Sequence, residues 1–380
     1  MSTKDPLPET NVLAVASHVV SGNVGNKIAV FVLQSMGCEV AALNTVQFSN
    51  HTGYRQWKGT RVSAQEITDL WEGLKMSFLD GFDMMLSGYV PGAAAVEAVG
   101  AIAKELRHKS EDSEYGGSFF WVLDPVMGDN GRLYVADDVV PAYKSLLSYA
   151  DLILPNQFEA ELLSGVKITD SASLEHAIEV LHRDYGVPHI VITSVSLPLS
   201  STSSPTPSPS SPSETRPRTM SVVGSSMTSD RKPRLFRISF PVFDCYFSGT
   251  GDMFAALMVA RLREAVARHD TTTVHHPASP EGAIPVASKR SWLCADGLHD
   301  PRTLPLARAA EMVLASMHEV LARTCDGLQD EVRKIRQRER KEGLDEKTVH
   351  LLTSRAAELK LARNLTCLRD PKVQYRAEKM

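Results

Sequence analysis

The feature that most constrains the fold of this chain is a regular alternation of short apolar segments with amphipathic helical patterns. From residue 11 onward, patterns of helical period separate apolar segments of strand type: NVLAVAS, EVAALNTVQFS, DMMLSGY, FFWVLDPVMG, DLILPN and HIVITSV. Such alternation builds βαβ units, in which helices cover parallel strands. The sequence therefore predicts an α/β fold with a mostly parallel central sheet and helices on both of its faces.

Local signals at helix ends support this interpretation. Ser63 and Glu66 have the spacing of a capping box, in which each residue satisfies a backbone N–H near the other. Gly37, Gly165 and Gly186 each follow a helical pattern at the position where glycine commonly ends a helix.

Two segments interrupt the alternation. Residues 196–233 are rich in Ser, Pro and Thr, and we interpret them as a disordered insertion because they carry too little apolar surface to offset chain entropy. Residues 270–303, rich in His, Pro and Ser, are interpreted as a second loop insertion. We expect a single domain over residues 11–366, with tails at 1–10 and 367–380.

The C-terminal part of the chain is expected to be helical. One helix should begin near Asp252 and run to about His269, and two more are expected over residues 304–324 and 347–365. The charged segment between the last two, EVRKIRQRERKEGLDEK, is interpreted as a solvated helix or loop.

Composition limits the class of ligand. An apolar content of 43% with 23% charged residues is typical of a globular protein with a sizeable core. The formal net charge is −4 and no basic stripe dominates, which argues against nucleic acid because phosphate backbones select for clustered Lys and Arg. We therefore expect a small-molecule ligand.

The cysteines and the N-terminal segment bear on the compartment. The cysteines lie far apart and form no C-x-x-C pair, which predicts neither a zinc site nor a disulfide framework: Cys38, Cys245, Cys294, Cys325 and Cys367. The N-terminal segment has no apolar core of a signal peptide, and no run of about 18 apolar residues occurs. We expect a soluble protein in a reducing, intracellular compartment.

The segment FSGTGD is the strongest chemical signal. Gly249, Thr250 and Gly251 predict a tight turn that leads into a helix, where backbone N–H groups and the helix dipole favour an anion such as a phosphate. Asp252 could act as a base there, or it could simply cap the helix. The chain contains no Gly-Lys dipeptide, so a Walker-type phosphate loop is excluded.

Two further clusters follow predicted strands. In LDPVMGD, Asp124 and Asp129 could hold Mg²⁺ at the carboxyl edge of the sheet, or they could serve only as turn residues. In LPNQFEAELLSG, Asn156 and Glu159 could share one face of a helix in a binding site. Equally, Asn156 could be an N-cap and Glu159 its capping partner.

Two loops near the N-terminus are less specific. The segment GNVGN at 22–26 lacks the spacing of a dinucleotide-binding motif and is interpreted as a tight turn. The run QFSNHTGYRQWKG carries Phe48, His51, Tyr54 and Trp57, which is dense in aromatic and hydrogen-bonding side chains. This run could serve ligand recognition or ordinary aromatic packing.

Taken together, these motifs resemble the pyridoxal kinase family of the ribokinase superfamily. The resemblance covers residues 11–195 and 235–265, through SHVVSGNVGNKIAVFVLQSMG, NTVQFSNHTGY, DPVMGD, PNQFEAELLSG, VITS and FSGTGD. It implies a ribokinase-like three-layer sandwich. It also implies ATP-dependent phosphorylation of the 5′-hydroxymethyl group of pyridoxal, pyridoxine or pyridoxamine, in the salvage of vitamin B6.

The resemblance assigns roles to individual residues. Asp252 would be the catalytic base, with Gly249, Thr250 and Gly251 as the anion hole. The vitamin would contact Ser17, Val19, His51, Thr52 and Tyr89, besides Asp252. The metal would lie near Asp124, Asp129, Glu159 and Thr193. ATP would contact Asp124, Tyr134, Asn156, Glu159, Thr193, Ser194, Phe243, Asp244, Cys245, Thr250 and Gly251.

The family also implies cofactors and an assembly. We expect Mg²⁺ or another divalent cation with ATP, a monovalent cation such as K⁺ or Na⁺, a homodimer, and a location in the cytoplasm, with the nucleus as a further compartment. Leu154 stands where relatives often carry Thr, which removes a hydroxyl near the monovalent site.

Three other functions remain open at this point. A kinase of the same fold that acts on hydroxymethylpyrimidine would use the same FSGTGD chemistry with a different pocket. A non-catalytic vitamin-binding pseudokinase would keep the fold, although it would be expected to lose Asp252 or the glycines. The Ser/Pro-rich insertion could instead be a docking segment on a degenerate domain.

Overall fold

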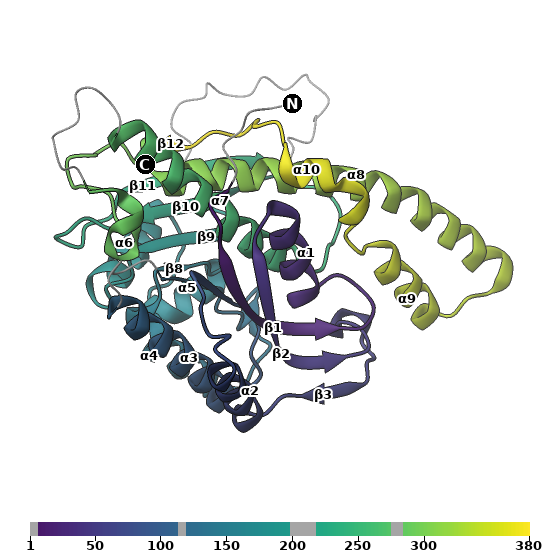
Figure 1. Cartoon of the computed structure of the whole chain (residues 1–380). Helices are drawn as coiled ribbons and strands as arrows, with labels where there is room; N and C mark the ends of the chain where they lie inside the picture. The colour runs from purple at the N-terminus through teal and green to yellow at the C-terminus, as the bar shows by residue number, and fades with distance from the viewer. Residues whose placement is uncertain (1–6, 113–118, 198–217, 275–283) are drawn as a thin grey trace, which may run out of the picture.

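A central ten-stranded sheet organises the chain (Figure 1), in a computed structural model that describes residues 7–112, 119–197, 218–274 and 284–380. The strand order is β12-β11-β10-β9-β8-β5-β4-β1-β2-β3. The strands are β1 (Asn11–Val19), β2 (Glu39–Phe48), β3 (Gly59–Arg61), β4 (Met84–Ser87), β5 (Phe120–Leu123), β8 (Leu152–Ile153), β9 (His189–Val195), β10 (Thr219–Ser226), β11 (Leu235–Pro241) and β12 (Glu378–Lys379). A separate hairpin pairs β6 (Gly128–Asp129) with β7 (Arg132–Leu133).

The centre of the sheet is parallel and its margins are antiparallel. Strands β2, β1, β4, β5, β8 and β9 all run in the same direction. Strand β3 at one edge, and β10, β11 and β12 at the other, pair antiparallel with their neighbours. The predicted α/β fold with a mostly parallel sheet is confirmed.

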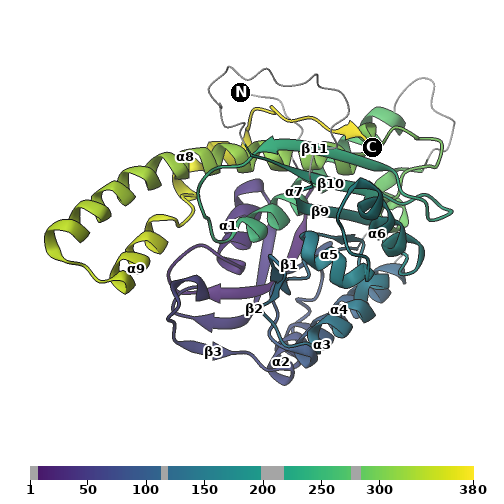
Figure 2. The same ribbon diagram turned by 180° about the vertical axis from the view of Figure 1, so that it is seen from behind.

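Helices cover both faces of the sheet, as the two opposite views show (Figures 1 and 2). One face packs on α1 (Asn26–Met36), α7 (Thr250–Val274), α8 (Pro305–Glu342) and α10 (Leu365–Arg369). The other face packs on α2 (Ala64–Met76), α3 (Ala93–Glu111), α4 (Val139–Leu146), α5 (Gln157–Ser164) and α6 (Ser171–Arg183). Each face encloses its own apolar core, so the molecule has three layers.

Helix ends follow the local sequence signals. The Ser63 side chain and the Glu66 side chain form the predicted capping box at the start of α2. Gly37 and Gly165 end α1 and α5 with φ values of 100° and 75°, a left-handed backbone that favours glycine. Gly186 lies beyond α6 with a φ of 67°.

The Ser/Pro-rich insertion is shorter than the sequence analysis predicted. Residues 198–217 lie outside the described residues, but Thr219–Ser226 forms strand β10 between β9 and β11. Val222 and Val223 on this strand are fully buried, one in each core. The prediction of a disordered insertion is wrong for residues 219–226. The Ser/Pro-rich composition of the whole segment masked a short apolar stretch, which pairs with β9 and β11 in the sheet.

The second predicted insertion is also partly ordered. Helix α7 extends to Val274, five residues beyond the expected end at His269. Residues 275–283 lie outside the described part of the chain, and the segment after them forms short 3₁₀ turns. Trp292 in that segment is buried and stacks on Phe120 of β5, with the ring centroids 4.0 Å apart. This loop is therefore a structural cover of the sheet.

The C-terminal region differs most from expectation. Helix α8 continues to Glu342 and so takes up most of the charged segment 331–347, and α9 (Glu346–Ala356) is shorter than expected. Residues 367–380 are no free tail, because Cys367 and Leu368 are fully buried and β12 pairs with β11. None of the helices within the described ranges carries the long apolar stretch that a membrane crossing requires.

A buried carboxylate ties the central sheet to its cover. Asp151, just before β8, is only 1% exposed. Its side chain accepts hydrogen bonds from the backbone N–H of Trp121 at 2.7 Å, from the Arg107 guanidinium and from the Ser291 hydroxyl. These donors come from β5, from α3 and from the 3₁₀ segment, so one side chain joins three elements.

We expect Asp151→Ala to lower the free energy of unfolding by about 3–5 kcal/mol, because it leaves the buried Arg107 charge without its partner. Urea denaturation followed by tryptophan fluorescence would measure the change. The matched control is Asp184→Ala, which removes an exposed carboxylate paired with Arg183 and should leave the unfolding midpoint unchanged. An equal loss in both variants would contradict the role of Asp151.

Candidate active site

Most of the predicted site residues lie at the carboxyl ends of the parallel strands. Ser17 and Val19 are near the end of β1, Tyr89 follows β4 and Asp124 follows β5. The remaining members of this group follow β2 and β8 or end β9: His51, Thr52, Asn156, Glu159, Thr193 and Ser194. Since β2 and β4 lie on opposite sides of β1, the chain reverses its strand order at β1, where α/β sheets commonly bind ligands.

The predicted anion-binding turn overlaps the start of α7, because Gly249 precedes the helix and Thr250 and Gly251 are its first two residues. Helix α7 begins at Thr250, so Asp252 lies in its first turn and is not the N-cap that the sequence analysis considered. Gly249 has a φ of 82°, and a Cβ there would lie 2.4 Å from the carbonyl oxygen of Asn23. Glycine is therefore required at this position, because the 22–26 loop packs directly against the turn.

The 22–26 loop positions the candidate base. The backbone N–H of Gly25 donates a hydrogen bond to the Asp252 carboxylate. Gly25 has a φ of 56°, and a Cβ there would lie 2.1 Å from the carbonyl oxygen of Ser17. The GNVGN segment is thus a tight turn, as predicted, and it also contacts Gly249 and Asp252, which was not predicted. Its two glycines, Gly22 and Gly25, were the signal in the sequence for such a close approach of two backbones.

The environment of Asp252 favours a base that is active near neutral pH. Burial raises the pKa of Asp252 to about 6, against the opposite effect of the Gly25 hydrogen bond. A carboxylate of this pKa is ionised at pH 7 yet accepts a proton more readily than an ordinary Asp.

Asp124 crowds the same region with negative charge. Asp124 is 7% exposed. Burial raises the pKa of its carboxyl group well above the usual value, and the negative charges of Glu159 and Asp252 raise it further. Among the described residues, no hydrogen-bond donor to its carboxylate is present. Three acidic side chains that interact in a desolvated site would gain from a cation between them and a bound polyphosphate.

Glu159 organises the loop after β5. Its Oε1 atom accepts the backbone N–H groups of Met127 at 2.8 Å and Gly128 at 3.3 Å, and its Oε2 atom accepts the N–H of Asn156 at 2.9 Å. The Asn156 side chain caps α5 in return and donates to the Gly128 carbonyl at 2.7 Å. Burial nevertheless raises the pKa of Glu159 to about 7.

This donor set fits a divalent cation that keeps most of its water. Among the described residues, no three or more His, Cys, Asp and Glu side chains form a preformed metal cage. Mg²⁺ typically uses one or two carboxylates together with waters and phosphate oxygens. Asp124 offers a carboxylate without a donor, and Glu159 orients the adjoining loop, so these residues suit Mg²⁺ bound with a nucleotide.

Asp129 and Tyr134 lie on the β6–β7 hairpin and the residue after it, outside the buried cluster. Asp129 is exposed, and its carboxylate accepts hydrogen bonds from Asn130. Tyr134 is 62% exposed, and desolvation of its hydroxyl together with the nearby Asp129 charge raises its pKa. Asp129 and Tyr134 therefore form an exposed polar rim at this edge of the sheet, whereas Asp124 and Glu159 are buried.

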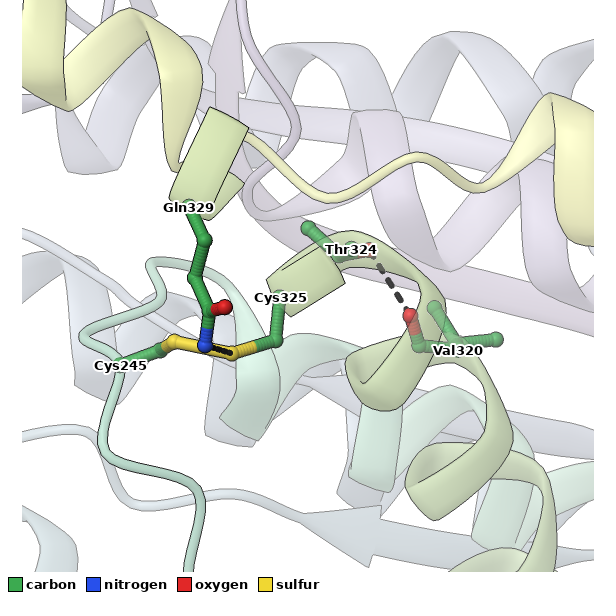
Figure 3. Close-up of a disulfide and its surroundings, with 5 residues drawn as sticks. All are labelled: Cys245, Val320, Thr324, Cys325 and Gln329. Atoms are coloured by element: carbon green, nitrogen blue, oxygen red, sulfur yellow. Dashed lines mark hydrogen bonds between the residues drawn. A yellow bond between two sulfur atoms is a disulfide. The ribbon is translucent and has the colours of Figure 1, made fainter. Parts of the chain in front are cut away.

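The 243–245 segment, which the resemblance assigns to ATP contacts, packs against α8. The ring of Phe243 lies 5.0 Å from that of His318, and Asp244 is exposed. Cys245 forms a disulfide with Cys325 on α8, 80 residues away in sequence (Figure 3). The expectation of unpaired cysteines is therefore wrong for this pair, because cysteine spacing in sequence cannot indicate contacts that the fold creates.

The expected vitamin side is lined by an apolar cluster. Val19 is buried with Val46 and Phe48, and Tyr89 and Val24 pack against them. His51 precedes the 3₁₀ turn η1 (Thr52–Tyr54) and Tyr54 is its last residue, and their ring centroids lie 4.7 Å apart. Thr52 is exposed. A Cβ on Gly53 would lie 3.7 Å from the Ser248 hydroxyl, so this turn faces the anion-binding turn.

A family model and curated relatives both match this chain. A family model described as phosphomethylpyrimidine kinase matches residues 94–273. The pyridoxal kinase of Ovis aries is 39% identical over 257 residues, which cover 66% of this chain and 77% of that protein. The pyridoxal kinase of Homo sapiens is 37% identical over the same lengths of alignment and coverage.

A solved structure extends the similarity to the whole fold. The pyridoxal kinase of Leishmania donovani, in complex with ADP and pyridoxamine, superimposes with a TM-score of 0.70 at 27% identity, over 98% of this chain and 100% of that one. Its ribokinase-type architecture is that of the sheet and helices described above. On these grounds of sequence and fold, the chain belongs to the pyridoxal kinase family.

Proposed function

We propose that this protein is an ATP-dependent kinase that phosphorylates the 5′-hydroxymethyl group of pyridoxal, pyridoxine or pyridoxamine. The observation that carries the proposal is the placement of Asp252. Its carboxylate has a raised pKa and lies in the first turn of α7, and a Cβ on Gly88, just after β4, would lie 4.0 Å from its Oδ1 atom. Membership of the pyridoxal kinase family supplies the substrate class.

The chain's own residues account for the steps that phosphoryl transfer requires. Asp252 accepts the proton of the attacking hydroxyl, and the amide of Gly25 holds its carboxylate in place. The free N–H groups at the start of α7 stabilise the transferring phosphoryl group. The chemistry asks the protein mainly for position and charge stabilisation, which these fixed dipoles provide.

The metal and nucleotide residues are assigned as follows. Asp124 and Glu159 would hold Mg²⁺, with Asp129 and Thr193 at the margin of the site. When bound, the ion neutralises the charge of the polyphosphate. Tyr134, Asn156, Ser194 and the 243–245 segment would contact ATP. Ser17, Val19, His51, Thr52 and Tyr89 would contact the vitamin.

We expect Asp252→Asn to lower kcat by about 10²- to 10⁴-fold, because the amide cannot accept the hydroxyl proton. Circular dichroism should show a normal fold, and calorimetric titration should show ATP affinity close to that of the unchanged protein. The surface variant Asp184→Asn provides the control and should retain full turnover. A near-normal rate in Asp252→Asn would contradict its assignment as the base.

The pH profile should report the same group. A carboxyl pKa raised to about 6 means that the base is protonated below pH 6 and ionised above it. At saturating Mg²⁺, which would keep Glu159 ionised although its pKa is raised to about 7, we therefore expect kcat/KM to level off above about pH 7 and to fall tenfold per pH unit below about pH 6. Far-UV dichroism at each pH would exclude unfolding. A flat profile down to pH 4.5 would count against Asp252 as the base.

A second substrate deserves a direct test, because the matching family model is described as phosphomethylpyrimidine kinase. Hydroxymethylpyrimidine presents a similar primary alcohol to the same base. We expect kcat/KM for pyridoxal to exceed that for hydroxymethylpyrimidine by at least about tenfold, since one or two lost polar contacts cost that much. Steady-state assays of both alcohols with purified protein would measure the ratio. A ratio below one would reassign the substrate.

The accessory properties rest on family membership. We keep the homodimer, a monovalent cation such as K⁺ or Na⁺, and a cytoplasmic location as proposals. Leu154, 2% exposed in the apolar core, offers no ligand oxygen on its side chain. Activation by K⁺, if present, would therefore depend on backbone carbonyls and on neighbouring residues.

A further inference from the structure

The C-terminal helices return to the vitamin side of the site. The distal ends of α8 and α9 project from the body in both views (Figures 1 and 2). After this excursion α9 packs against the turn η1, where the Nε2 atom of His350 lies 3.0 Å from the carbonyl oxygen of Gly53. The segment that follows α9 then brings Glu358 against both N-terminal loops.

Glu358 is a buried carboxylate with three hydrogen-bonding partners, two at Oε1 and one at Oε2. Glu358 is 8% exposed. Oε1 lies 3.0 Å from the Tyr54 hydroxyl and 3.2 Å from Nε2 of His51, and Oε2 accepts the backbone N–H of Asn23 at 2.8 Å. Burial alone would raise the pKa of Glu358, but hydrogen bonds from His51, Asn23 and Tyr54 hold it below its usual value.

The two loops that Glu358 joins both lead to the anion-binding turn. A Cβ on Gly22 would lie 2.6 Å from Oε1 of Glu358, so the 22–26 loop approaches the carboxylate directly. Through the Asn23 carbonyl this loop contacts Gly249, and through the Gly25 amide it holds Asp252. A Cβ on Gly53 of the 51–54 turn would lie 3.7 Å from the Ser248 hydroxyl, next to Gly249 in the chain.

We propose that Glu358 is a positioning residue for the vitamin: it fixes the 22–26 loop and the 51–54 turn against the anion-binding turn, so that the alcohol meets its base. The kinetic part of this inference rests on the proposed function. The residue is not a catalytic group, because the hydrogen bonds of its carboxylate within the described part of the chain go to the two loops and not to Asp252, Asp124 or Glu159.

The nature of the contacts makes one substitution informative. Glu358→Gln keeps the size of the side chain but removes its negative charge and replaces one acceptor oxygen by an NH₂ donor. The hydrogen bonds to Asn23, Tyr54 and His51 are then no longer charge-assisted and become weaker, and the ion pair with protonated His51 is lost. The 22–26 loop and the 51–54 turn should therefore become more mobile while the sheet and the nucleotide side stay unchanged.

Kinetics gives the first test. We expect Glu358→Gln to raise the KM for pyridoxal about tenfold to hundredfold, the range that a hydrogen bond to a charged group supports. The KM for ATP should change less than twofold. The control is Glu311→Gln, whose carboxylate likewise joins the C-terminal segment by accepting the N–H of Ala377 at 2.9 Å and pairing with Arg376. It should leave both KM values unchanged.

Hydrogen exchange gives a second test that needs no activity. Peptides that span residues 20–26 and 49–55 should exchange at least about tenfold faster in Glu358→Gln than in the unchanged protein, and at the same rate in Glu311→Gln. If the unchanged protein does not phosphorylate pyridoxal, the proposed function fails, yet faster exchange of these peptides would still show that Glu358 fixes the two loops. Unchanged exchange would overturn this positioning role whatever the substrate.

A milder variant covers the case in which Glu358→Gln does not fold. Tyr54→Phe removes one donor to Oε1 and keeps the ring, so a smaller rise in the KM for pyridoxal is expected. If both variants fold, their combination should give less than the product of the single effects, because they break the same network. Equal increases in the KM values for ATP and pyridoxal would indicate general loosening and would overturn the positioning role.

Discussion

The structure depends on the parallel arrangement of its central strands. Because β2, β1, β4, β5, β8 and β9 run in one direction, all of their carboxyl ends meet at one edge. The crossover helices then fill both faces and leave that edge to the loops. Segments that are 100 or more residues apart in the chain, such as those of Ser17, Asp124 and Asp252, can therefore act on one ligand.

The opposing electrostatic effects at that edge explain its chemistry. Desolvation raises the pKa values of Asp124, Glu159 and Asp252, and the mutual repulsion of the carboxylates adds to this for Asp124. Fixed backbone N–H groups act in the opposite direction at Glu159 and Asp252. The outcome is a site in which three acidic groups interact and one of them, Asp252, has a pKa of about 6, which suits the base that we propose.

Alternatives that the sequence left open were often not exclusive. Asn156 and Glu159 do form the capping box of α5, yet Glu159 also accepts the amides of the 127–128 loop beside Asp124. Conversely, Asp252 does not cap α7, since the helix starts two residues earlier. Strand β10 was missed because a short apolar stretch follows a long Ser/Pro-rich one, and composition averages over both.

The sequence by itself determined the α/β architecture, the helix caps and the motif residues at the strand ends, because these depend on periodicity and on contacts between near neighbours in the chain. Only the tertiary structure decided the Gly25 contact with Asp252, the Cys245–Cys325 pair and the Glu358 network. Glu358 meets Asn23 across 335 residues of sequence and Tyr54 across 304. No local pattern encodes such a contact, since it arises only when packing of the whole chain brings the last helices back to the first loops.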